Sequence, residues 1–266
     1  MHEILTQLPP GALVLDLGSG RGSFDTVQFP LQVVLADLVP PPQAPASFVA
    51  CSADRLPFPD HTFHALILNH SLEHFENLSA SVSEISRVLS TNGFLYVAVP
   101  DASTLTDHVY RWLGRGGGHV NPFTDAAAVA RMFTEATGLP HAGTRLLCTS
   151  LSFLNRRNIP TRPPRKLLLF CNGNETFLRA LTFALRYIDR WFHLRASVYG
   201  WAFFFGDPLT PDVAVWTNVC IRCGSGVPSA SLPVTRRRIL PDVYNCPSCG
   251  TRNLFTDDQT RSLRLQ

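Results

Sequence analysis

The feature that most constrains this chain is an apolar segment that runs directly into an acidic residue and a glycine-rich loop. Residues 12–15 are apolar, Asp16 follows, and glycines stand at positions 18, 20 and 22. Glycine permits the positive φ of a tight turn and lets a ligand approach the backbone closely. The pattern predicts a strand followed by a loop that holds a nucleotide-like ligand. A helix after the loop would add N–H groups for an anionic part of the ligand.

The composition is that of an ordinary globular protein. The chain has 266 residues, of which 45% are hydrophobic and 16% are charged, so it has room for one large domain and an appendage. The net charge of +3 does not require a nucleic-acid partner, and we interpret the basic clusters at 156–166 and 236–238 as solvated surface. The start lacks the features of a secretory signal, and no uncharged apolar run reaches the roughly 18 residues of a membrane span. We expect a cytoplasmic protein.

Short apolar segments alternate with helical stretches in the first hundred residues. We predict strands at 12–15, 32–36, 47–50, 64–68 and 94–99, and a helix at 80–89 that is ended by Asn92-Gly93. This alternation is typical of an α/β fold with a parallel sheet and crossover connections. Pro30 leaves little room for a helix between the first two strands.

The second half of the chain predicts further elements. We expect a helix at 124–137 ended by Gly138, strands at 144–153 and 199–205, and a helix with an aromatic face at 175–194. The last helix is interpreted as part of a core or of a lid inserted at about 102–198. The alternative is a basic amphipathic helix lying on a membrane surface.

Acidic residues stand at or just beyond three successive strand ends. Asp16, Asp37 and Asp54 would then share the carboxyl edge of the sheet, where ligands of open parallel sheets bind. Carboxylates accept hydrogen bonds, so they suit a ligand rich in hydroxyls and amines. Asp37 follows Gly22 by 15 residues, the distance at which an acid reaches ribose hydroxyls. Each aspartate alone could equally be a helix cap or a turn residue, but three in register favour a ligand site.

Five ordered motifs carry a resemblance to a known family. They are the glycine loop from Asp16 to Gly22, Asp37, the segment SADRLPFPD at 52–60, the segment NHSLEH at 69–74, and Arg-Val-Leu at 87–89 before Gly93. Together they resemble class I S-adenosylmethionine-dependent methyltransferases, most closely the type found in ubiquinone and menaquinone biosynthesis. The resemblance implies a doubly wound Rossmann-like sheet, S-adenosylmethionine as cofactor, and methyl transfer in which the enzyme mainly positions donor and acceptor.

The resemblance also implies roles for individual residues. The glycine loop would pack on the methionine part of the cofactor, Asp37 would bind the ribose diol, and Asp54 would accept a hydrogen bond from the adenine amino group. Leu56 would lie against the adenine ring, and Asn69 and His70 would line the floor beneath the methyl group. The expected cofactor contacts are Asp16, Gly18, Ser19, Gly20, Gly22, Asp37, Leu38, Asp54, Arg55, Leu56, Asn69 and His70.

Histidines are the candidates for a general base. His70 follows the fourth strand and His119 follows a glycine-rich loop, and either imidazole could deprotonate a hydroxyl acceptor. His74 is interpreted as a structural part of its turn. An amine acceptor could react without a base.

Four cysteines near the C-terminus form two pairs. Cys220 and Cys223 are separated by two residues, as are Cys246 and Cys249, and 22 residues lie between the pairs. Such pairs predict a structural zinc site with four thiolate ligands, with iron as the alternative. We interpret Cys51, Cys148 and Cys171 as isolated core cysteines.

The predicted organisation is a methyltransferase domain at 1–212, a zinc ribbon at 213–257 and a tail at 258–266. The first functional hypothesis is methylation of a small-molecule, lipid or sugar acceptor. The alternatives are an RNA or protein methyltransferase that recognises its substrate with the ribbon and Arg236–Arg238, and a non-catalytic interaction module.

Overall fold

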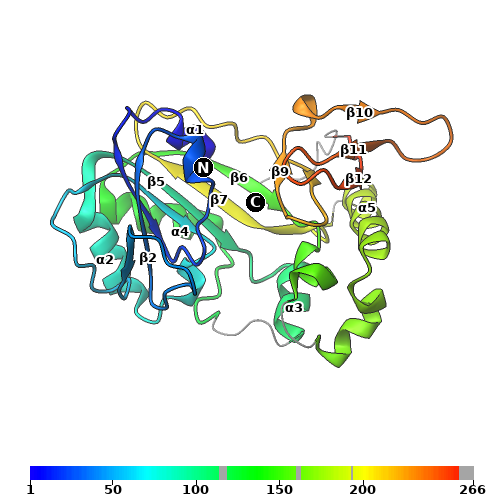
Figure 1. Ribbon diagram of the computed structural model, residues 1–266, viewed down its shortest axis with the longest axis horizontal. Helices are drawn as coiled ribbons and strands as arrows, with labels where there is room; N and C mark the ends of the chain where they lie inside the picture. The colour runs from blue at the N-terminus through cyan, green and yellow to red at the C-terminus, as the bar shows by residue number, and fades with distance from the viewer. Residues whose placement is uncertain (114–118, 160–162, 193, 258–266) are drawn as a thin grey trace. The chain divides into compact units, whose positions relative to one another are not determined.

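The computed structural model describes residues 1–113, 119–159, 163–192 and 194–257 (Figure 1). Contacts between Cα atoms divide the chain into two compact units. Unit 1 comprises Met1–Pro100, Gly118–Arg145 and Trp201–Val213, and unit 2 comprises Asp101–Gly117, Leu146–Gly200 and Ala214–Gln266. The expected tail at 258–266 lies outside the described residues.

A seven-stranded sheet with the order β3-β2-β1-β4-β5-β7-β6 is the main element (Figure 1). Its strands are β1 (Leu13–Leu17), β2 (Gln32–Asp37), β3 (Phe48–Ala50), β4 (Phe63–Asn69), β5 (Leu89–Pro100), β6 (His141–Cys148) and β7 (Val198–Phe205). Strand β1 pairs in parallel with β2 and with β4. The strand order reverses between these two pairs, and such a switch point is where open α/β sheets bind ligands. The predicted Rossmann-like fold class is confirmed.

The central strands are apolar on both faces. Val14, Leu15, Leu66 and Ile67 are fully buried, as a parallel sheet covered on both sides requires. All five strands predicted in the first hundred residues are present, so the continuous apolar runs were sufficient to locate them.

The connection from β1 to β2 contains no α-helix. Its described residues form one 3-10 turn, η1 (Thr26–Gln28), capped by the Asp25 side chain, which accepts from the N–H of Val27. This confirms that Pro30 leaves little room for a crossover helix. The glycine loop therefore has no following α-helix whose N-terminus could face an anionic ligand.

Helices α1 (His2–Leu5), α2 (Leu78–Val88) and α4 (Ala126–Thr137) belong to unit 1. Gly138 ends α4 with a φ of 70°, as predicted. The predicted end of α2 at Asn92-Gly93 is wrong, because the helix stops at Val88 and residues 89–93 begin β5. Gly93 lies close to backbone there: a Cβ atom on it would be 2.9 Å from the Ser90 oxygen and 3.1 Å from that of His64.

Unit 2 contains helices α3 (Leu105–Trp112) and α5 (Glu175–Phe192) and 3-10 segments η3 (Ser152–Leu154), η4 (Arg156–Asn158) and η5 (Arg165–Gly173). The strand predicted at 144–153 ends at Cys148, because Leu151 takes a φ of 56° and the chain turns into η3. No helix in the described part of the chain is long and apolar enough to cross a membrane.

The cysteine-bearing segment of unit 2 forms two small antiparallel sheets. They consist of β8 (Asn218–Val219) with β9 (Gly226–Val227), and of β10 (Val234–Thr235), β11 (Val243–Asn245) and β12 (Arg252–Leu254), with η6 (Ser229–Ser231) between them (Figure 1). The buried Arg186 of α5 donates hydrogen bonds to the carbonyls of Thr149, Ser197 and Thr217. These bonds tie the segment before β8 to α5.

Candidate functional site

The glycine loop after β1 is shaped by one close contact and two open positions. A Cβ atom on Gly18 would lie 2.2 Å from the Cβ of Ser71, whose hydroxyl donates to the Leu17 carbonyl at 2.8 Å. Among the described residues, no atom lies within 4 Å of where a Cβ on Gly20 would be, and for Gly22 the nearest atom would be 3.8 Å away. The loop therefore packs against the segment after β4 at its first glycine and leaves open space beside the backbone of the other two.

Asp16 closes the loop from inside the protein. It is fully buried and accepts two hydrogen bonds of 2.7 Å from the backbone N–H and the hydroxyl of Ser23. Burial raises the pKa of Asp16, and the bonds from Ser23 offset part of that effect. Both carboxylate oxygens accept from Ser23, so Asp16 holds the glycine loop from its buried side.

Asp37, at the end of β2, reaches the same loop. Its Oδ2 atom accepts a hydrogen bond of 2.8 Å from the N–H of Gly20, and its neighbour Leu38 is exposed. Ser19 is nearly buried, and its N–H donates to the carbonyl of Ala36. Two of the predicted acidic positions, Asp16 and Asp37, are thus coupled to one loop.

The segment that carries Asp54 and Arg55 starts beside Asp37, whose carbonyl accepts from the N–H of Cys51 at 3.0 Å. Asp54 and Arg55 are exposed, and Leu56 is buried. All three follow the end of β3 at Ala50 by four to six residues.

Sequence reasoning missed the residues that hold this segment in place. On α2, Glu84 accepts from the N–H of Leu56 at 2.7 Å, and Arg87 donates to the carbonyls of Leu56 and Phe58. Glu84 and Arg87 also form an ion pair of 2.7 Å. Their spacing of three residues on a predicted helix was the available signal.

The end of β4 brings Asn69 and His70 to the same edge. The N–H of His70 donates to the carbonyl of Ala98 at 2.9 Å, and the residue takes a φ of 56°. Burial, with smaller contributions from the nearby His119 and His74, lowers the pKa of His70 to about 4. The His70 imidazole is therefore neutral at neutral pH.

His119 lies against the turn η2 (Leu72–His74) that follows His70. The ring centroids of His74 and His119 are 4.8 Å apart, with an angle of 72° between the rings. Each of Glu73, His74 and His119 has a ligand atom within 4.8 Å of those of the other two. The structure thus brings together the two histidines predicted as bases and adds His74 and Glu73 to them.

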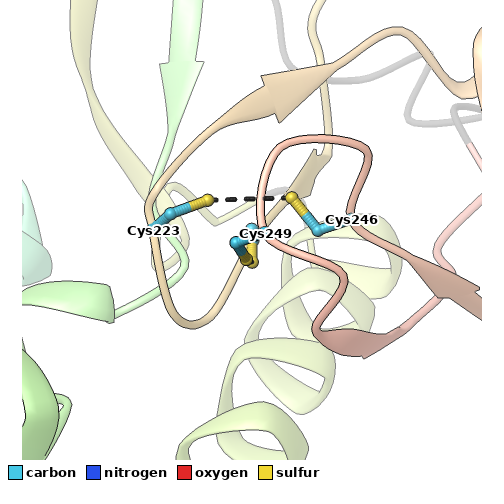
Figure 2. Close-up of side chains that lie close together, drawn as sticks. Cys223, Cys246 and Cys249 are labelled. Atoms are coloured by element: carbon cyan, nitrogen blue, oxygen red, sulfur yellow. Dashed lines mark hydrogen bonds between the residues drawn. The ribbon is translucent and has the colours of Figure 1, made fainter.

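The four cysteines near the C-terminus also converge. Figure 2 shows three of them, Cys223, Cys246 and Cys249. The Sγ atoms of Cys220 and Cys249 are 3.6 Å apart, those of Cys223 and Cys246 are 3.7 Å apart, and all four lie within 4.8 Å of one another. Four thiolates arranged tetrahedrally at the usual Zn–S distance have sulfur atoms about 3.8 Å apart. The cluster therefore fits a tetrahedral metal ion.

A glycine with a positive φ follows each cysteine pair. Gly224 and Gly250 follow the two pairs with φ of 74° and 71° and donate to the carbonyls of Cys220 and Cys246. Burial raises the pKa of the Cys220 thiol, and the N–H of Arg222 donates to its sulfur at 3.4 Å. Two glycine-closed turns thus present the four sulfurs to one point.

The remaining cysteines differ in burial. Cys148 is buried and Cys51 is half-buried, but Cys171 is exposed. Its interpretation as a core cysteine is wrong, because Cys171 and Asn172 take φ of 48° and 54° in a kink of η5 that turns the side chain away from the core.

Comparison with known proteins locates one family. The family model described as "Methyltransferase domain" matches residues 15–97, which contain the glycine loop, Asp37, the 52–60 segment and the turn after β4. A comparison with curated protein sequences finds no match.

Many solved structures resemble the chain at low identity. A protein described as a methyltransferase from an antibiotic biosynthesis pathway of Anabaena variabilis is 18% identical, with 76% of this chain and 93% of that chain covered and a TM-score of 0.48. The 1,6-didemethyltoxoflavin N1-methyltransferase of Burkholderia thailandensis is 17% identical, with 76% and 73% covered and a TM-score of 0.45. A Haloferax volcanii complex of the Trm112 methyltransferase activator with a methyltransferase is 18% identical, with 78% and 88% covered and a TM-score of 0.46. At these values the resemblance says nothing about what this chain binds.

Proposed function

We propose that this chain, an S-adenosylmethionine-dependent methyltransferase by its sheet topology and by the family match over residues 15–97, methylates a small-molecule acceptor. The observation that carries the proposal is the coupling of the glycine loop to Asp37 across the switch point of the sheet. When bound, S-adenosylmethionine supplies a methyl group on a positively charged sulfur.

The cradle fits this cofactor. The open backbone beside Gly20 and Gly22 would lie along its methionine part, as no side chain among the described residues fills that space. We assign the ribose hydroxyls to Asp37. The Oδ2 atom of Asp37 already holds the loop, so the ribose would take the remaining acceptor capacity of this carboxylate.

We assign the adenine end to the segment after β3. The exposed Asp54 would accept from the exocyclic amino group, with Arg55 and Leu56 beside the ring. The Glu84–Arg87 pair positions this segment through the backbone of Leu56. The other expected contacts, from Asp16, Gly18, Ser19 and Leu38, would act by shaping the loop and its border.

The acceptor would enter near Asn69 and His70. Both lie at the end of β4, and the neutral imidazole of His70 could accept a proton from an acceptor hydroxyl. We place this role on His70 in preference to His119, since His119 faces His74 and Glu73. The residues otherwise contribute by orientation, because displacement at a methyl carbon requires the two reacting atoms in line.

The cysteine cluster is assigned to a structural zinc ion. Its sulfur separations fit a tetrahedral site, and four thiolates leave no open position for catalysis. As domains we propose the methyltransferase domain at 1–212 with its lid insertion at about 102–198, and the ribbon at 213–257. Ile221, between the first two cysteines, packs in the same core as Leu151 and Leu178, so the zinc ion would support the lid.

Two observations favour a small acceptor over RNA. One basic residue in each cluster has a protein partner: Lys166 donates to the carbonyl of Trp112, and Arg236 pairs with Asp242 at 2.7 Å. Strong RNA binding instead needs several cations free to contact phosphates. Protein substrates and a non-catalytic role are separated by the experiment that follows.

The test combines binding and transfer on zinc-loaded protein. Calorimetry should show one S-adenosylhomocysteine site per chain. Label from S-adenosylmethionine should be transferred to a compound in a mixture of small metabolites. The Asp37→Ala variant serves as the inactive control. Labelling confined to RNA or protein would contradict the proposed acceptor class. If the unaltered protein does not bind S-adenosylhomocysteine, the enzyme assignment is contradicted.

A further inference from the structure

Three metal-ligating side chains of unit 1 come from two separate segments. Glu73 and His74 belong to η2, and His119 lies 45 residues further along the chain. One ligand atom of each lies within 4.8 Å of those of the other two. Two imidazoles and a carboxylate within this distance form a donor set typical of divalent transition metals.

Backbone hydrogen bonds hold the two segments together. The N–H groups of Val120 and Asn121 donate to the carbonyl of Glu73 at 2.9 and 3.1 Å. The Asn121 side-chain amide donates to the carbonyls of Leu72 and Phe75 at 3.2 and 2.7 Å. Four bonds from two consecutive residues therefore set His119 opposite the turn, independently of its side chain.

Burial distinguishes this cluster from an ordinary surface group. The Glu73 side chain is 1% exposed, His119 is half-buried and His74 is exposed. A carboxylate is rarely buried to this degree unless it is paired or binds a metal. The Glu73 carboxylate also forms an ion pair of 4.0 Å with the imidazole of His70. The cluster thus combines a buried anionic ligand with a ligand that solvent can reach.

We propose that Glu73, His74 and His119 bind one divalent transition-metal ion, separate from the ion at the four cysteines. Three protein ligands leave coordination positions for water or for an oxygen of a bound molecule. The site follows β4 directly, beside Asn69 and His70. The metal site stands on its own geometry, and a role in orienting a hydroxyl-bearing acceptor rests on the proposed function.

Cobalt(II) distinguishes the two metal sites. Protein loaded with one zinc ion at the cysteines is titrated with Co²⁺, and metal content and absorption are measured. We expect one further equivalent of Co²⁺ with weak visible bands and without the intense sulfur-to-cobalt absorption of thiolate ligation, because the ligands are nitrogen and oxygen. If the zinc-loaded protein binds no cobalt, or if the bound cobalt shows the intense thiolate absorption, the proposal is overturned.

Variants locate the ion. Glu73→Gln keeps the size of the buried side chain, and His74→Ala changes an exposed one, so the second variant remains informative if the first fails to fold. Each should weaken Co²⁺ binding about tenfold or more. Glu76→Gln, an exposed carboxyl in the same loop, is the matched control and should bind as the unaltered protein does. Unchanged affinity in folded Glu73→Gln and His74→Ala would refute the assignment.

Calorimetry with S-adenosylhomocysteine on the same samples separates the two proposals. Cobalt binding without cofactor binding leaves the metal site standing and contradicts the proposed function. Cofactor binding by protein that takes up no cobalt leaves the proposed function standing and contradicts the metal site.

Discussion

The carboxylate of Asp37 accepts a hydrogen bond of 2.8 Å from the backbone N–H of Gly20, so the end of β2 holds the loop that follows β1. This bond crosses 17 residues and joins two of the five motifs that mark the family. The acid expected to bind ribose therefore also organises the loop that would hold the rest of the cofactor.

Substitution of Asp37 separates these two roles. Asp37→Ala removes both and should abolish binding of S-adenosylhomocysteine. Asp37→Asn keeps an oxygen for the Gly20 N–H but lacks the charged acceptor for the ribose diol, so affinity should fall by about 10- to 100-fold, the value of a hydrogen bond to a charged group. Calorimetry measures both. Full affinity in Asp37→Ala would refute the assignment of the ribose site.

Gly18 should be the least replaceable glycine of the loop. Gly18→Ala places a Cβ 2.2 Å from that of Ser71 and adds the penalty of a φ of 70°. Gly11 has a φ of 80° and nothing within 4 Å of the added Cβ, so Gly11→Ala isolates the backbone penalty of about 1–2 kcal/mol. Urea unfolding should show a clearly larger loss for Gly18→Ala. Equal losses would mean that the contact with Ser71 relaxes without cost.

The Glu84–Arg87 pair should give a stability that depends on pH. Its hydrogen bond with Arg87 holds the pKa of Glu84 below the usual 4.5. The stabilisation is therefore complete above pH 4.5 and is lost as pH falls through the lowered pKa of the folded state. Glu84→Gln should lower the free energy of unfolding by about 1 kcal/mol at pH 7, and the difference should shrink below pH 4.5.

The same variant tests the positioning of the adenine segment. Glu84→Gln removes the charge that pairs with Arg87, which in turn donates to the carbonyls of Leu56 and Phe58, so it should also weaken S-adenosylhomocysteine binding at pH 7. Glu135→Gln, an exposed carboxyl on α4, is the control and should change neither quantity. A cofactor affinity that is unaffected by Glu84→Gln would show that the segment keeps its place without this ion pair.

Removal of zinc should loosen unit 2 in particular. Cys220 and Ile221 are buried, and Ser150 donates to the Cys220 carbonyl at 2.9 Å, so the cysteine turns are part of the packing of the unit. A chelator or Cys249→Ser should lower the thermal midpoint and increase amide exchange in α5. Cys171→Ser changes an exposed thiol and should retain zinc and stability. Zinc-free protein with undiminished protection of α5 would contradict a structural role.

Local sequence patterns predicted much of the fold, because burial on both faces of a parallel sheet leaves continuous apolar runs. The central strands at 12–15 and 64–68 follow from such runs, and the helix ended by Gly138 follows from helical periodicity and a glycine stop signal. The end of α2 and the early end of β6 did not, because one involves the close approach of Gly93 to the His64 carbonyl and the other the positive φ of Leu151. Spacing cannot report such contacts.

The candidate site, like the fold, has features that the sequence predicts and features that only the tertiary structure reveals. The sequence by itself determined the glycine loop, the three strand-end aspartates and the two cysteine pairs, because each is a short-range pattern with its own chemistry. Only the tertiary structure decided that Gly20 bonds to Asp37, that Glu84 holds the backbone of Leu56, and that His119 faces Glu73. These relations join residues 17 to 46 positions apart, and the folding of the intervening chain, which no local periodicity encodes, brings them together.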